Sequence, residues 1–222
     1  RKFHRECGTL TPHVEESLVN LYEPDCVLLM TARQPNLFAY SGVFRKATLN
    51  HVLAERLYES LDVPVVSFFG FADQDFTDDR WVKSAQIPDV ERRNGVLELR
   101  VPLPEKTMLN KIPNPPRAML DRWQQDMQSW IQRKTKAVAE LSKSSGVKPA
   151  DDKEYWENFR QIWSIVSNAQ DRAQTYADFN AFVISKIVNG EWEYDTLFCR
   201  FSECQQIFRR EFRSLIHEFR RY

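Results

Sequence analysis

The chain has 222 residues with 31 basic and 31 acidic side chains, so its formal charge at pH 7 is zero. This balance gives no electrostatic reason to expect nucleic acid or an anionic membrane as a partner. Hydrophobic residues make up 42% of the chain, enough for the core of one large domain, whereas six glycines are too few for long phosphate-binding loops.

The chain carries neither a signal peptide nor an apolar run of membrane length. Its four cysteines form no CxxC pair, and its four histidines are scattered, so we expect no metal site. These features predict a cytoplasmic protein. The absence of an initiator Met and a helical pattern that runs to the last residue predict a piece of a longer protein.

Two apolar runs frame a helical pattern early in the chain. They cover residues 26–30 and 63–71, and a polar loop at 33–42 and a helix at 43–60 lie between them. The first run is apolar at every position, which predicts a strand covered by helices on both faces. Strand, helix and strand form a βαβ unit, and its parallel sheet predicts a site at the carboxyl ends of the strands.

A β-hairpin and a group of helices follow the βαβ unit. Residues 81–87 and 95–101 alternate in polarity around an Asn94–Gly95 turn, which is typical of a hairpin. A proline-rich connector then leads to three predicted helices, at residues 117–141, 155–169 and 175–188. A polar loop at residues 142–153 separates the first two.

The chain then returns to the sheet. Residues 197–201 predict a short strand, and Ser202 is placed to cap a last helix at residues 203–222. We therefore predict an α/β fold with a parallel sheet, a β-hairpin addition and a helical insertion. Its parts are the first section of the core (1–101), the insertion (102–190), and the return strand and helix (191–222).

The last predicted helix is strongly basic, with an apolar stripe between its arginines. The pattern favours a helix with a solvated basic surface and a buried apolar stripe. The alternative is nucleic-acid binding, which the neutral charge of the whole chain opposes. The basic residues are Arg209, Arg210, Arg213, Arg220 and Arg221.

The first polar loop gathers hydrogen-bond donors at the entrance of a helix. Thr31 ends the strand, and Arg33, Gln34 and Asn36 follow it, while Lys46 lies one turn into the helix. A phosphate or carboxylate would be stabilised there by the loop amides, the cations and the helix N-terminus. The loop contains neither a Walker A nor a GxGxxG motif. The alternative interpretation is a polar turn with a solvated Arg33.

The second strand ends in Asp73, Gln74 and Asp75. On an extended backbone the two aspartates point to the same side, where they could bind an amine, hold a magnesium ion or act as a base. Capping of a turn or helix by Asp75 and Asp78 is the alternative.

Both loops resemble those of the cysteine ligase family of bacillithiol biosynthesis. Residues 31–38, with Gly42 and Lys46, are similar to its Thr-Gly-Gln-Gln segment, which Gly-Leu-Phe and a lysine-bearing helix follow. Residues 64–76 are similar to its Pro-Val strand that runs into Glu-Asp-His-Asp-Phe. The resemblance covers residues 24–222, the N-terminal half of a family member. It implies a Rossmann-like core and a reaction that joins cysteine to the amine of a glucosaminyl-malate.

This chain departs from the family pattern within both loops. Ala32 and Arg33 replace the family's Gly and first Gln, and Ala72 and Gln74 replace its Glu and His. Glutamine carries no titratable proton, so any proton transfer by the family's histidine is done otherwise here or not at all. We therefore predict a divergent member with a different amino acid or amine acceptor.

The resemblance implies roles for the loop residues. Asp73 and Asp75 would hold or deprotonate the amine of an acceptor such as an amino-sugar conjugate, with Gln74 between them. Thr31 and Arg33, together with Gln34, Asn36 and Lys46, would bind the anionic group. ATP or ADP is a candidate for acyl activation, and the full-length protein is a candidate homodimer. The alternative function is a nucleotide- or sugar-phosphate-binding module, either non-catalytic or glycosyltransferase-like.

Overall fold

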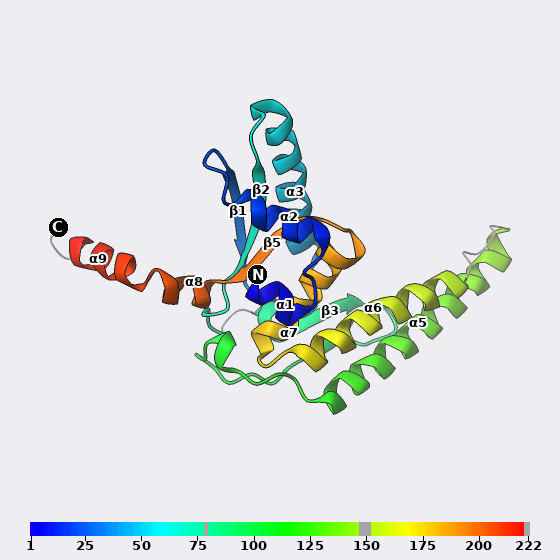
Figure 1. The fold of residues 1–222 in the computed structure, drawn as a ribbon. Coiled ribbons are helices and arrows are strands. Elements are labelled where there is room, and N and C mark those ends of the chain that lie inside the picture. The colour runs from blue at the N-terminus through cyan, green and yellow to red at the C-terminus, as the bar shows by residue number, and fades with distance from the viewer. Residues whose placement is uncertain (78–79, 147–151, 220–222) are drawn as a thin grey trace.

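The computed structural model describes residues 1–77, 80–146 and 152–219, which form one mixed α/β structure (Figure 1). Residues 78–79, 147–151 and 220–222 lie outside this description, and with them Asp78, part of the predicted 142–153 loop and the end of the last predicted helix. The elements are α1 (Lys2–Cys7), α2 (Pro12–Asn20), β1 (Val27–Arg33), α3 (Ser41–Leu61), β2 (Val65–Phe71), α4 (Arg80–Lys83), β3 (Ser84–Pro88), β4 (Val96–Arg100), η1 (Leu109–Lys111), α5 (Arg117–Ser145), α6 (Asp152–Arg172), α7 (Tyr176–Ser185), η2 (Lys186–Glu191), β5 (Leu197–Arg200), α8 (Phe201–Ile207) and α9 (Arg209–Phe219).

A three-stranded sheet with the order β1-β2-β5 lies at the centre, and both pairs of neighbours are parallel. The βαβ unit β1-α3-β2 and the return strand β5 are therefore confirmed. Helix α3 packs against β1 and β2, and α2 packs against β2 and β5. Thr11 caps α2 as predicted, because its hydroxyl accepts the N–H of Val14.

The prediction that both faces of the first strand are covered is wrong. Leu28 is 47% exposed and Met30 is 61% exposed. Strand β1 lies at the edge of the sheet, whereas α2 packs on β2 and β5. One face of β1 is consequently open at Leu28 and Met30. The strand also continues to Arg33, three residues beyond its predicted end.

A buried amide fastens α3 to the sheet. The Asn50 side chain, 5% exposed, donates to the Leu29 carbonyl at 3.0 Å and to the Ser67 hydroxyl at 2.8 Å. We expect Asn50→Ala to lower the free energy of unfolding by about 2 kcal/mol, because the substitution leaves buried acceptors unpaired. Urea denaturation would measure this loss. Leu49→Ala, on the same helix but at a site that is 58% exposed, should change stability by less than about 0.5 kcal/mol; equal losses in the two variants would contradict the assigned role of Asn50.

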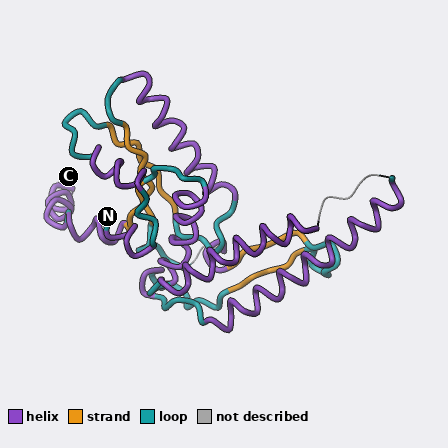
Figure 2. Tube along the Cα trace, turned by 45° about the vertical axis from the view of Figure 1, so that its right-hand side comes forward, coloured by secondary structure: helices purple, strands orange, loops and turns teal. Residues whose placement is uncertain are grey.

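The predicted hairpin is present as the antiparallel pair β3-β4. The predicted start of its first strand, at residue 81, is wrong, because residues 80–83 form the helical turn α4 and the strand begins at Ser84. The hairpin runs beside the long helix α5 (Figure 2). Trp130 donates to the Pro88 carbonyl at 3.0 Å, and Arg133 and Lys134 form ion pairs with Asp89 at 2.8 and 3.2 Å. These contacts join the hairpin to the helical insertion.

One hydrophobic cluster connects the sheet, the hairpin and the insertion. It includes Phe69 of β2, Leu97 of β4, Trp123 of α5 and Phe179 of α7, all of them buried. The sheet, the hairpin and the helical insertion thus share a core.

The predicted last helix is divided. Arg200, and not Ser202, occupies the N-cap position of α8, and the helix breaks at Phe208 before α9 begins. The predicted buried stripe is wrong for the side chains that are described, since Ile207 is 74% exposed, Phe208 52% and Ile216 53%. Figure 1 shows α9 extending away from the rest of the molecule.

Candidate functional site

The two predicted loops meet at the carboxyl ends of β1 and β2. The Gln34 side chain donates to Asp75 Oδ2 at 2.6 Å, and the backbone N–H of Ala72 donates to the Arg33 carbonyl at 3.0 Å. Because β1 and β2 are parallel and in register from Val27 to Arg33, both loops leave the same edge of the sheet. The sheet topology therefore brings Arg33, Gln34, Ala72 and Asp75 into one neighbourhood.

The expected pair of carboxylates does not form. Residues 73–75 are a turn and not an extended segment, with the Asp75 N–H bonded to the Ala72 carbonyl at 3.2 Å. The turn sends the two side chains to different partners. Asp75 contacts Gln34 and the N–H of Phe76, whereas Asp73 faces α8.

Asp73 is a buried anchor that is 2% exposed. Its carboxylate accepts the Ser202 N–H at 2.9 Å, the Ser202 hydroxyl, and the Asn110 side chain at 3.2 Å. The negative charge lies at the N-terminus of α8, where it is favourable. Because these three hydrogen bonds occupy the carboxylate, Asp73 is better placed to hold the site together than to accept a proton.

The described residues contain seven buried side-chain nitrogen or oxygen atoms without a hydrogen-bond partner, and five of these belong to the two loops and Asn110. Asn36 is 1% exposed and contributes both of its amide atoms. Arg33 Nε, Gln74 Oε1 and Asn110 Oδ1 are the other three. Buried polar atoms are nearly always paired, so this concentration marks the groups available to a polar ligand.

Thr31 and Lys46 lie at the margins of this group. Thr31 is half-buried within β1 and pairs in register with Phe69. Lys46 is exposed, and its ammonium lies 3.5 Å from the Ala32 carbonyl. Thr31 and Lys46 are neighbours of the first loop in the sequence. The buried atoms of this loop that lack hydrogen-bond partners belong to Arg33 and Asn36 instead.

Two cavities lie near the loops or near the residues that contact them. An apolar cavity of about 300 Å³ includes Leu37, Phe38 and Tyr40 of the first loop in its wall. A polar cavity, also of about 300 Å³, is lined by Asn110 and Ser202, the two partners of Asp73, and by charged residues from several elements. The first loop thus borders a hydrophobic space, and the two hydrogen-bond partners of Asp73 border a charged one.

One cation in the polar cavity is already neutralised. The Arg200 guanidinium forms ion pairs with Glu6 at 2.7 Å, Asp178 at 2.6 Å and Glu203 at 3.2 Å. Burial opposes the charge, but these carboxylates outweigh it and raise the Arg200 pKa. Arg200 therefore serves the structure, and the wall also contains the cations Lys2, Lys111 and Arg172.

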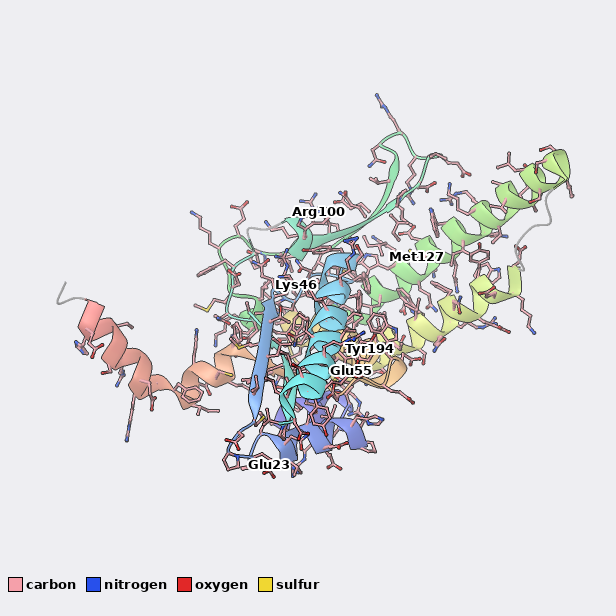
Figure 3. The ribbon with its side chains drawn as sticks, turned by 90° about the horizontal axis from the view of Figure 1, so that it is seen from above. Glu23, Lys46, Glu55, Arg100, Met127 and Tyr194 are labelled. Carbon is pink, nitrogen blue, oxygen red and sulfur yellow. The ribbon has the colours of Figure 1, made fainter. Side chains whose placement is uncertain are left out.

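A larger cavity of about 680 Å³ lies at the other end of the sheet, near the start of β2. His51 in its wall bonds to Asp195 at 2.9 Å and stacks on Tyr194 with 3.9 Å between ring centroids. Figure 3 shows Glu55 and Tyr194 close together, with Lys46 farther along α3. This cavity is larger than the two beside the loops, but His51 already has an acidic partner, Asp195, in the same wall. The buried polar atoms without hydrogen-bond partners lie elsewhere. We therefore place the site at the strand-end loops.

Three residues of the site escaped sequence reasoning. Asn110 lies in η1 within a proline-rich connector, and Ser202 was interpreted as a cap for its own helix. Tyr40 precedes α3 and contacts Arg33, with the guanidinium carbon 5.5 Å from the ring centroid. Only Tyr40 had a local signal, as an aromatic residue inside a polar loop.

No known protein-family model matches this chain, and no curated protein matches it. Within the described residues, no three His, Cys, Asp or Glu side chains are grouped closely enough to hold a metal ion. In the same residues, no helix is both long and apolar enough to cross a membrane.

Proposed function

We propose that this chain is a Rossmann-like ligase of the cysteine-adding type, which forms a C–N bond between an amino acid and an amine acceptor. The observation that carries the proposal is the set of unpaired buried polar atoms at the carboxyl ends of two parallel strands. Open α/β sheets bind ligands at this edge. The resemblance of both loops to the bacillithiol cysteine ligases supplies the reaction type.

The loop geometry supports separate roles for the two sides of the site. Arg33 and Asn36 would bind the carboxyl group of the amino acid through their unpaired nitrogen atoms. The amine acceptor would enter from the polar cavity that adjoins Asn110 and Ser202. Two cavities beside one pair of loops suit a reaction with two substrates.

Asp75 is the candidate base of this reaction. As the amine nitrogen bonds to the acyl carbon, a proton leaves the nitrogen, and the half-buried Asp75 carboxylate would accept it. Gln34 orients that carboxylate through its 2.6 Å hydrogen bond. Asp73 does not take part in the proton transfer, but its hydrogen bonds to Ser202 and Asn110 hold the loop that carries Asp75 in position. A free carboxylate must be activated before it forms an amide. With ATP as the activating reagent, the bond from the acyl carbon to the phosphate or AMP group would break as the C–N bond forms, and that group would leave.

The ligase is tested by incubation with amino acids, amino sugars and their conjugates, with and without ATP, and by mass spectrometry of the products. We expect a condensed product, and we expect Asp75→Asn to lower turnover about 100-fold or more with little loss of binding. Asp62→Asn is the matched control, because Asp62 is exposed at the end of α3 in a left-handed conformation that asparagine tolerates. A complete panel without any product would reject the ligase.

A nucleotide- or sugar-phosphate-binding module is the second candidate. It is favoured by Gln74, which occupies the position of the family's histidine, and by the engagement of Asp73 in structural hydrogen bonds. This function predicts saturable binding of ATP, ADP or a sugar phosphate, measured by calorimetry, together with no turnover. The same panel therefore separates the two candidates. The four free cysteines suit the reducing cytoplasm in which we place either activity.

A further inference from the structure

The apolar cavity beside the first loop has an unusually aromatic wall. Side chains from the first loop, α4, the hairpin, α5 and α6 enclose it. Met127, which is labelled in Figure 3, contributes from α5. The aromatic residues in the wall are Phe38, Tyr40, Trp81, Phe159 and Trp163.

The cavity has the size and the access that an aromatic ring needs. A dry protein cavity of roughly 150 Å³ is enough to bind benzene, and this one measures about 300 Å³. Protein cores normally pack without such voids. Tyr40 at 40% exposure and Trp81 at 37% place part of the wall at the surface, so a ligand can reach it.

The cavity adjoins Arg33, whose Nε has no hydrogen-bond partner among the described residues. Tyr40 lines the cavity, and the Arg33 guanidinium carbon lies 5.5 Å from the centroid of its ring. The rings of Tyr40 and Trp81 are 6.0 Å apart. Arg33 Nε and both amide atoms of Asn36 lack partners. A hydrophobic space and a binding point for a carboxylate therefore lie within one short loop.

The loop is held in its shape by aromatic packing. Phe38 has φ of 43°, a left-handed conformation that is uncommon for a bulky residue. Its ring packs against Trp123, Trp163 and Phe179, with centroids 5.4, 6.3 and 6.0 Å away. Strained backbone of this kind persists where its surroundings enforce it, often at ligand sites. The wall is thus formed before a ligand binds.

We propose that the cavity binds the aromatic ring of an amino acid whose carboxylate pairs with Arg33, so that the acyl donor of this protein is an aromatic amino acid. The role as donor rests on the proposed ligase function, whereas the binding site does not require it. Cysteine would leave most of the cavity unfilled, and the replacement of the family's Gln by Arg33 adds a fixed positive charge for the carboxylate.

Calorimetric titration tests the site without turnover. L-phenylalanine should bind roughly 30-fold more tightly than L-alanine, because its ring leaves water for an apolar wall. 3-Phenylpropanoate should also bind. Arg33→Gln should weaken both aromatic carboxylates about 10-fold or more and leave phenethylamine, which has no carboxylate, unchanged. Arg56→Gln, at an exposed position on α3, is the charge-matched control.

A cavity-filling variant tests the position of the ring. Ala85 lines the cavity, and Ala85→Trp should reduce the affinity for L-phenylalanine to that for L-alanine. Val90→Trp adds the same side chain at an 87% exposed position and should bind as the original protein does. If Ala85→Trp does not fold, Ile162→Trp, at a wall position that is 52% exposed, replaces it.

The results separate the two proposals. Equal affinity for L-phenylalanine and L-alanine, or undiminished binding by the filled variant, would overturn the aromatic site. Selective binding of L-phenylalanine without any ligated product would keep the aromatic site and reject the ligase. A product formed from cysteine in preference to L-phenylalanine would keep the ligase and reject the aromatic donor.

Discussion

Asp73→Ala is expected to lower the free energy of unfolding by about 4 kcal/mol, the largest effect of any single substitution near the site. The change removes the acceptor for the Ser202 N–H, the Ser202 hydroxyl and the Asn110 amide, and Asp73 itself is 2% exposed. Each hydrogen bond to a buried charge contributes about 1.5–3 kcal/mol, and the unpaired donors add a penalty. Urea denaturation followed by circular dichroism would measure the loss.

Asp73→Asn distinguishes an anchor from a base. The amide oxygen can still accept the Ser202 N–H, but the new NH₂ group then faces the Asn110 NH₂ donor. We expect a loss of about 2 kcal/mol, and ligase activity that falls in step with the folded population. Asp75→Asn, at a half-buried position bonded to Gln34, should change stability by less than about 1 kcal/mol. Unchanged stability of Asp73→Asn with complete loss of product would instead identify Asp73 as the base.

The parallel sheet was predictable because its signals are local. Each strand is an apolar run of a few residues that ends in polar ones, and the helix between β1 and β2 has its own apolar period. Parallel pairing then places both loops at one edge of the sheet without further information, which is why Gln34 and Asp75 lie together.

The anchor could not be predicted because its partners are distant in the chain. Asp73 and Ser202 are 129 residues apart, and Asn110 is 37 residues from Asp73. Ser202 near the start of a helical pattern is a sound local cap, yet the structure uses its N–H and hydroxyl as donors to another residue. The turn at residues 73–75 accompanies these hydrogen bonds, which hold the Asp73 side chain against α8.

Whether β1 and α9 are exposed depends on which other elements pack against them, and the residues within each element do not show this. Leu28 and Met30 have the composition of a buried strand, but β1 is at the edge of the sheet. Ile216 lies in an amphipathic helix that extends from the molecule and is 53% exposed. Periodicity identifies an apolar face, and only the arrangement of the elements decides whether that face is buried.

Acidification is expected to destabilise the protein through His4. This side chain is fully buried, with Nδ1 2.9 Å from the Thr9 hydroxyl and Nε2 accepting the N–H of Phe198 at 2.9 Å. Burial lowers the His4 pKa from its ordinary value of 6.5 to about 3. Below pH 6.5 the unfolded chain therefore binds a proton that the folded chain does not, and stability falls by about 1.4 kcal/mol per pH unit until the pH approaches 3.

The His4 contribution is isolated by comparison with His4→Gln, because other groups also titrate. His51 acts in the opposite sense, since its hydrogen bond to Asp195 raises its pKa and its contribution is lost as the pH rises. Glutamine at position 4 offers one donor and one acceptor but no proton equilibrium. The stability difference between the original protein and His4→Gln should shrink by about 2 kcal/mol from pH 7 to pH 5 in urea titrations. A stability difference for His4→Gln that stays constant between pH 7 and pH 5 would mean that the fold does not hold His4 neutral.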